Sequence, residues 1–153
     1  MGAPAEEQAA RYDILLETSS HKLTILIVED QDLLRQLLRE LLRFAHPHAL
    51  ILDTDSAEHV FELCDSYHPK VVLMDVKLPD ANGVVLSARL KALLPGTEII
   101  VISQYSAQVF IEQAMAAGVF AYITKDRVYR ELLPTLARAL ETRHGPPQPD
   151  EMV

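Results

Sequence analysis

Residues 23–30 read LTILIVED, a run of apolar and mostly β-branched residues that stops at two adjacent acids. The run is nearly continuous in its hydrophobicity instead of alternating, which is typical of a strand buried on both faces of a parallel sheet. Four further runs share this character. They cover residues 49–52, 71–74, 99–102 and 119–123. Together with residues 23–28, they predict five short buried strands.

Helical patterns separate these runs. The clearest carries leucines at positions 33, 34, 37, 38, 41 and 42, and polar residues (Arg35, Gln36, Arg39 and Glu40) fill the opposite face. The other predicted helices cover residues 56–66, 84–94, 107–117 and 129–142. Ser56 is the expected N-cap of the first of these, Pro95-Gly96 ends the second, and Gly118 ends the third. Five alternations of strand and helix predict an α/β fold with a parallel sheet, right-handed crossovers and helices on both faces.

The two ends of the chain differ from this regular centre. Residues 1–21 are polar, apart from an amphipathic stretch around Tyr12, Leu15 and Leu16, and we interpret them as an N-terminal extension. Residues 144–153 contain three prolines and a glycine and are interpreted as a flexible tail or linker. The predicted domain therefore covers residues 22–143.

Bulk composition limits the partners and the location. The formal net charge of −8 argues against direct binding to nucleic acid and to anionic membranes, which basic surfaces recognise. No apolar run is long enough to cross a bilayer. The single cysteine, Cys64, lies in an apolar helical pattern and is expected in the core, which fits a reducing cytoplasm.

Polar side chains follow four of the five predicted strands. Glu29 and Asp30 end the first, Asp75 the third, Ser103 the fourth, and Thr124-Lys125 the fifth. Because ligands of open α/β sheets bind beyond the carboxyl ends of the strands, we expect these groups to converge on one site.

This set of side chains suits phosphoryl transfer to a carboxylate. Three clustered acids repel one another, and a hard divalent cation such as Mg²⁺ relieves the repulsion. Asp75 would act as the nucleophile, while Lys125 and Ser103 would stabilise the oxygens of the transferred group. The product would be an aspartyl phosphate.

The same residues carry a family resemblance. IVED at 27–30 resembles the acidic pair of response-regulator receiver domains in two-component systems, and DVKLP at 75–79 with Asn82-Gly83 is similar to their phospho-acceptor segment. Ser103, and residues 117–125 with Tyr122 and Lys125, are similar to the family's hydroxyl residue and last strand. The resemblance covers about residues 22 to 142. With Tyr at position 105, and with Asp126 and not Pro after the lysine, the chain is most similar to NarL/FixJ-type receivers of the CheY-like superfamily.

The resemblance implies a detailed fold and site. The fold would be a (βα)5 doubly wound sheet of flavodoxin-like order 2-1-3-4-5. Asp75 would accept the phosphoryl group, and Asp30, Asp75 and the backbone carbonyl of Lys77 would bind Mg²⁺, with Glu29 acting through water. Lys125 would contact the phosphoryl group. Ser103 would move toward it, and Tyr122 would then turn inward as a switch.

The family also implies the kind of activity and partners. A sensor histidine kinase or a phosphotransfer protein would be the donor, and the domain would catalyse its own modification without being a turnover enzyme. Two further points stay open. One is control of transcription through an output domain outside this chain. The other is a homodimer, formed through the fourth or fifth helix or through the first and fifth.

Three other protein classes share part of this pattern. A pseudo-receiver would keep the fold without phosphorylation, but no key position is lost. A haloacid-dehalogenase-type enzyme needs an Asp where Lys77 stands, and a dinucleotide-binding enzyme needs a glycine-rich turn after the first strand. Asp30 would also suit a helix N-cap, and Tyr122 an ordinary core position.

Two positions near the expected site depart from the commoner family pattern. Gln104 stands where a small residue is usual, and Lys77 is bulky, as is Tyr105 beside Gln104. We expect these side chains to restrict access, so that phosphorylation and hydrolysis are both slow.

Overall fold

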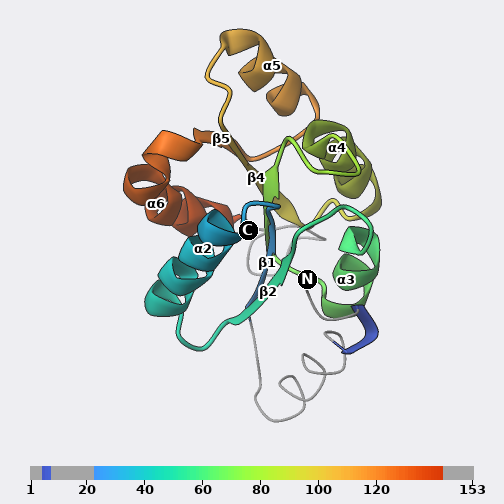
Figure 1. The fold of residues 1–153 in the computed structure, drawn as a ribbon, viewed down its shortest axis with the longest axis vertical. Helices are drawn as coiled ribbons and strands as arrows, with labels where there is room; N and C mark the ends of the chain where they lie inside the picture. Colours follow the sequence, from blue (N-terminus) through green and yellow to red (C-terminus); the bar gives the residue numbers. More distant parts are fainter. Residues whose placement is uncertain (1–4, 8–22, 143–153) are drawn as a thin grey trace, which may run out of the picture.

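The computed structural model describes residues 5–7 and 23–142. Its centre is a parallel five-stranded sheet of order β2-β1-β3-β4-β5, which confirms the predicted fold class (Figure 1). The strands are β1 (Thr24–Val28), β2 (Leu50–Thr54), β3 (Val71–Asp75), β4 (Glu98–Ser103) and β5 (Ala121–Thr124). Most of the predicted N-terminal extension and the whole of the 144–153 tail lie outside the described residues.

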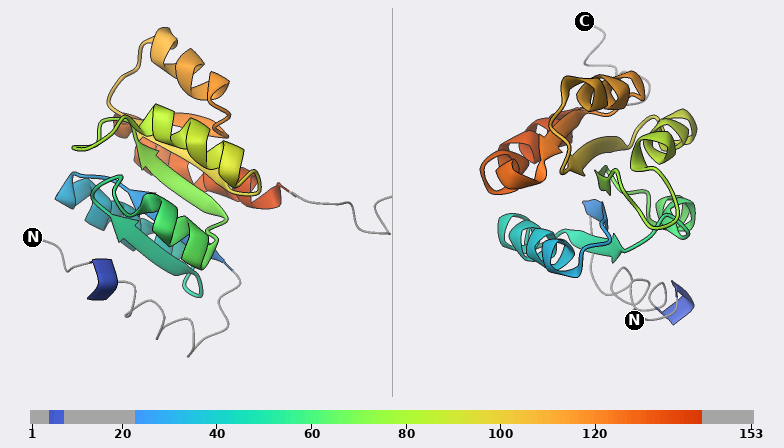
Figure 2. Two further views of the ribbon diagram at one scale, coloured as in Figure 1. Left: turned by 90° about the vertical axis from the view of Figure 1, so that its right-hand side faces the viewer. Right: turned by 45° about the horizontal axis from the view of Figure 1, so that its top comes forward.

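Helices cover both faces of the sheet, as predicted (Figure 2). The helices are α2 (Asp32–Ala45), α3 (Val60–Tyr67), α4 (Gly83–Leu93), α5 (Gln108–Ala116) and α6 (Val128–Glu141), the last preceded by the 3-10 turn η1 (Lys125–Arg127). α2 and α6 pack on one face, and α3, α4 and α5 contribute to the core on the other (Figure 1).

The centres of β1, β3 and β4 are apolar because each of these strands contributes side chains to two cores. In β1, Ile25 and Ile27 face the core under α2 and α6, whereas Leu26 and Val28 face the core under α3 and α4. All four side chains are at most 1% exposed. Neighbouring side chains of a strand point to opposite faces, so burial on both sides requires an unbroken apolar run.

The start of α3 differs from the prediction. Ser56 is not its N-cap, because the helix begins at Val60 and residues 55–59 form turns. Ser56 instead exchanges hydrogen bonds with the Thr54 side chain, and the Ala57 N–H donates to Asp80 Oδ1 at 2.8 Å. The Ala57 N–H therefore binds the loop after β3 and not a capping side chain at the start of a longer helix.

Asp30 is not the N-cap of α2 either. That position belongs to Gln31, whose side chain makes no cap hydrogen bond. The Gln31 N–H donates to Glu29 Oε2 at 3.1 Å, which leaves the Asp30 side chain for the acidic cluster described below.

Candidate functional site

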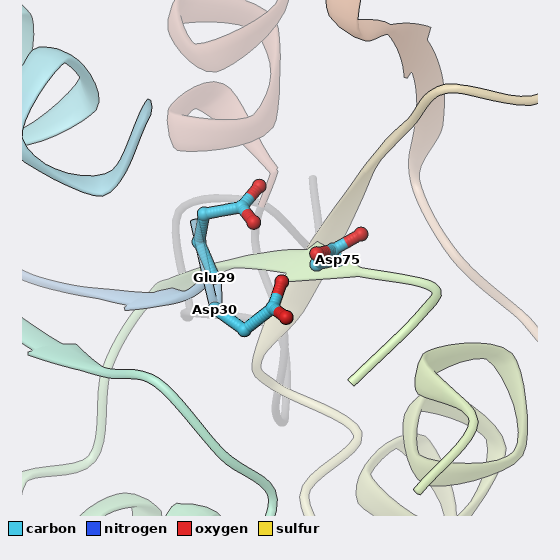
Figure 3. A group of neighbouring side chains, drawn as sticks. All are labelled: Glu29, Asp30 and Asp75. Carbon is cyan, nitrogen blue, oxygen red and sulfur yellow. The ribbon is translucent and has the colours of Figure 1, made fainter. Parts of the chain in front are cut away.

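Three carboxylates meet at the carboxyl ends of β1 and β3. Glu29 and Asp30 follow β1, Asp75 is the last residue of β3, and Figure 3 shows the three side chains gathered together. One oxygen from each lies within 4.8 Å of the others. Glu29 is 1% exposed and Asp75 4%, whereas Asp30 opens to solvent. The predicted acidic cluster is therefore assembled, with its two innermost members buried.

Lys125 brings a positive charge to this cluster from the end of β5. Its Nζ lies 3.2 Å from Glu29 Oε1 and 3.4 Å from Asp75 Oδ2. It also donates to Gln31 Oε1 at 3.1 Å. Glu29 Oε1 itself has no hydrogen-bond donor among the described residues, although the ammonium group is near. One lysine thus balances only part of the charge of three acids.

The loop that follows Asp75 is held close to the strand. The Lys77 N–H donates to Asp75 Oδ1 at 3.3 Å, and the Gly83 N–H donates to the Val76 carbonyl at 2.7 Å. A Cβ on Gly83 would lie 1.9 Å from the Asp75 carbonyl oxygen, so this position requires glycine. Asn82 then caps α4 by accepting from the Val84 N–H. The start of this loop is therefore held against Asp75.

Ser103 and Tyr122 both bind the backbone of Tyr105. The buried Ser103 Oγ accepts a hydrogen bond from the Tyr105 N–H at 3.1 Å. The half-buried Tyr122 donates its hydroxyl to the Tyr105 carbonyl at 2.6 Å. The ring of Tyr105 packs on Phe110 of α5, with ring centroids 4.9 Å apart. The loop between β4 and α5 is thereby tied to two residues with predicted switch roles.

A cavity of about 260 Å³ opens over the cluster. Its lining is mostly polar and comes from the ends of β1, β3, β4 and β5 and from the loop after β3: Asp30, Gln31, Asp75, Lys77, Leu78, Pro79, Ser103, Gln104, Tyr105 and Lys125. Gln104, Lys77 and Tyr105, the side chains expected to restrict access, are all in this lining.

Burial and neighbouring acids change the proton affinity of the cluster. Burial of the Asp75 carboxyl, with the hydrogen bond and charge of Glu29, raises its pKa to about 6, and Lys125 opposes the rise. The pKa of Asp30 is also raised, first by loss of surrounding water and then by Asp75. A bound cation would stabilise the ionised forms of these two carboxyls, which lie beside a third acid.

The sequence prediction missed two contacts. Gln31 accepts from Lys125, and Arg35 Nη1 donates to the Glu29 carbonyl at 3.0 Å. Arg35 was expected on the polar face of its helix, yet its side chain is only 20% exposed. A contact to a backbone carbonyl depends on the fold and leaves no residue-type signal in the sequence.

None of the helices in the described part of the chain is both long enough and apolar enough to span a membrane.

Residues 25–137 match the response regulator receiver domain family. PdtaR of Mycobacterium tuberculosis, a transcriptional regulatory protein, is 30% identical over 118 residues, which cover 76% of this chain and 56% of PdtaR. DegU of Brevibacillus brevis, also a transcriptional regulatory protein, is 26% identical over 72% of this chain and 47% of its own length. This chain thus spans about half the length of these curated relatives.

Solved structures agree. The structure of a LuxR-family DNA-binding response regulator from Staphylococcus aureus aligns with a TM-score of 0.70 and 26% identity, covering 76% of this chain and 98% of that one. A CheY-like receiver domain protein from Methanospirillum hungatei aligns with a TM-score of 0.72 and 26% identity, over 78% and 94% of the two chains. With its matched sequence, its sheet order and its acidic pocket, the chain belongs to the receiver-domain family of two-component response regulators.

Proposed function

We propose that Asp75 accepts a phosphoryl group from a phosphohistidine and that the resulting acyl phosphate switches a protein-interaction surface. A receiver is a signalling phospho-acceptor rather than a turnover enzyme, and its family implies a histidine kinase as partner. The observation that carries the proposal is the buried Asp75 carboxylate, which lies beside Lys125, opens into the cavity and is flanked by two further acids.

The donor set fits Mg²⁺, which prefers carboxylates, carbonyls and water as ligands. Asp30 and Asp75 would hold the ion, with the Lys77 carbonyl as a third protein ligand and Glu29 acting through water. The Glu29 oxygen that has no hydrogen-bond donor among the described residues, and the raised pKa values of Asp75 and Asp30, favour such a cation. When bound, Mg²⁺ would supply positive charge for the phosphoryl oxygens.

The transfer itself needs few changes. An Asp75 oxygen attacks phosphorus, an O–P bond forms, and the N–P bond to the donor imidazole breaks, with the bonding pair returning to the ring nitrogen. The Lys125 ammonium group, 3.4 Å from Asp75 Oδ2, is placed to follow the new negative charge on the phosphoryl oxygens. In this way the domain's own residues promote its modification.

The switch would run through Tyr105. In the resting state, Ser103 Oγ accepts from the Tyr105 N–H, and Tyr122 donates to the Tyr105 carbonyl. A Ser103 hydroxyl drawn toward the phosphoryl group would give up the first bond, and the β4–α5 loop would move with Tyr105. Tyr122 would then lose its acceptor and turn inward. Chemistry at Asp75 is thereby converted into a new surface around α5 and β5.

Gln104, Lys77 and Tyr105 would control the rate of this chemistry. All three line the small cavity through which a donor or an attacking water must pass. We therefore retain the proposal that they slow both small-donor phosphorylation and hydrolysis.

The wider role rests on the relatives. DegU and PdtaR are transcriptional regulatory proteins, and this chain spans about half of each. We infer that the switched surface acts, in the cytoplasm, on an output domain that controls transcription. Pairing of two receivers is compatible with this role.

Intact-mass spectrometry provides the test. Protein incubated with acetyl phosphate and Mg²⁺ should gain the mass of one phosphoryl group, and the gain should be absent in Asp75→Asn and in EDTA. A phosphorylated histidine kinase or phosphotransfer protein serves as the second donor. If neither donor modifies the wild-type protein, the domain is an interaction module without phosphorylation, and the proposal fails.

A further inference from the structure

Two arginines of α2 extend from the helix toward the edge of the sheet. Arg35 Nε lies 3.7 Å from Asp53 Oδ2, and Arg39 Nη1 lies 3.2 Å from Asp53 Oδ1. Asp53 belongs to β2 and is paired in register with Ile27 of β1. Both arginine side chains are 20% exposed. The two residues therefore share a helix, a partner and a degree of burial.

Only Arg35 also contacts the segment that carries the acidic pair. Its Nη1 donates to the Glu29 carbonyl at 3.0 Å, and its Nη2 donates to Asp32 Oδ1 at 2.6 Å. Asp32 is strongly exposed, so that ion pair adds little stability. The bond to the Glu29 carbonyl is the feature that distinguishes Arg35 from Arg39.

The Glu29 backbone is thereby held on both sides. Its N–H donates to the Thr54 carbonyl of β2 at 3.0 Å, and its C=O accepts from Arg35. The carbonyl belongs to the peptide unit that joins Glu29 to Asp30. Because a peptide unit is planar, the direction of this carbonyl determines the direction in which the chain enters Asp30. The Asp30 side chain opens to solvent and is not held by burial.

We propose that Arg35 is a positioning residue, which orients the Glu29–Asp30 peptide so that the Asp30 carboxylate stays at the Mg²⁺ site. The inference rests on the proposed function, because it assigns a support to the metal site described there. A planar guanidinium contacts Asp53 and the Glu29 carbonyl at the same time, and a lysine ammonium on a flexible stem does so poorly. Residues that orient metal ligands typically contribute 10- to 100-fold to metal affinity.

The test compares the two arginines. The Mg²⁺ dissociation constant is measured by isothermal titration calorimetry on the wild-type protein, Arg35→Ala and Arg39→Ala, and urea unfolding in EDTA gives the stability of each. We expect a 10- to 100-fold weaker affinity for Arg35→Ala and a change of less than twofold for Arg39→Ala. Equal losses of affinity in both variants would show a shared structural or electrostatic effect and overturn the proposal.

A second pair separates position from charge and guards against failed folding. Arg35→Lys and Arg39→Lys keep the charge near Asp53 and disturb packing less than alanine. Arg35→Lys should still weaken Mg²⁺ binding several-fold, whereas Arg39→Lys should not. Wild-type affinity in Arg35→Lys would refute positioning by the guanidinium. If the wild-type protein binds no Mg²⁺, both the proposed function and this inference fail; if Mg²⁺ binds equally to all variants, this inference fails alone.

Discussion

Replacing Asp75 with asparagine should make the metal-free protein more stable at neutral pH, although it removes the predicted phospho-acceptor. Asp75 is 4% exposed and lies against Glu29, and its pKa is raised from 3.8 to about 6. Each tenfold difference in proton affinity corresponds to about 1.4 kcal/mol. Ionised Asp75 therefore costs about 3 kcal/mol in the folded state. Because the asparagine amide must find new partners, we expect a net gain of about 1–3 kcal/mol.

The sign of the pH dependence follows from the direction of the pKa change. The folded state holds the Asp75 proton more tightly than the unfolded state, so stability is lost as pH rises from about 4 to about 6, and the full cost is present above that range. The advantage of Asp75→Asn should therefore be largest at pH 7. The part of this advantage that comes from the ionisation of Asp75 should fall to about half at pH 5.

Urea unfolding in EDTA at pH 7 and pH 5 measures both effects. Asp65→Asn, which removes an exposed acid of α3, is the control and should change the stability by less than about 0.5 kcal/mol. Added Mg²⁺ should stabilise the wild-type protein more than Asp75→Asn and narrow the gap, since a ligand that binds the folded state stabilises it. A variant no more stable than wild type at pH 7, or a gain that does not shrink at pH 5, would refute the electrostatic reasoning.

Three further predictions concern other parts of the site. Gly83→Ala should lower the unfolding free energy by about 2–4 kcal/mol and abolish phosphorylation, because its Cβ would meet the Asp75 carbonyl at 1.9 Å. Gly118→Ala, strained only by its φ of +92°, should cost about 1 kcal/mol, and equal losses in urea unfolding would contradict the clash. Tyr122→Phe removes the 2.6 Å bond to the Tyr105 carbonyl and should cost about 1 kcal/mol with faster amide exchange in the β4–α5 loop; unaltered exchange would argue against the tie. Gln104→Ala and Lys77→Ala should each speed labelling by acetyl phosphate, measured by intact mass over time, and unchanged rates in both would remove the proposed restriction of access.

The sheet could be predicted from the sequence because the main requirement on each strand is local. A strand buried on both faces must be apolar at every position, and β1 satisfies this from Ile25 to Val28. The first residue of α3 could not be predicted from the local sequence in the same way. The Ala57 N–H binds Asp80, a residue 23 positions later, and a pattern read along the chain contains no sign of that partner. The helix therefore does not begin at Ser56, and the backbone beside it makes a tertiary contact with Asp80.

The same reasoning separates the predictable part of the site from the rest. Strand-end residues such as Asp75 and Lys125 could be placed together because the ends of parallel strands meet at one edge of the sheet. Arg35 and Arg39 were predicted on the polar face of α2, opposite the leucines, and that pattern named no partner for them. In the structure their side chains are only 20% exposed and reach Asp53. Their role depends on where β2 lies beside β1, because that pairing brings Asp53 and the Glu29 carbonyl within reach of one guanidinium. A supporting contact of this kind can be recognised only after the fold is known, and for this reason the comparison of Arg35 with Arg39 tests information that the sequence pattern did not contain.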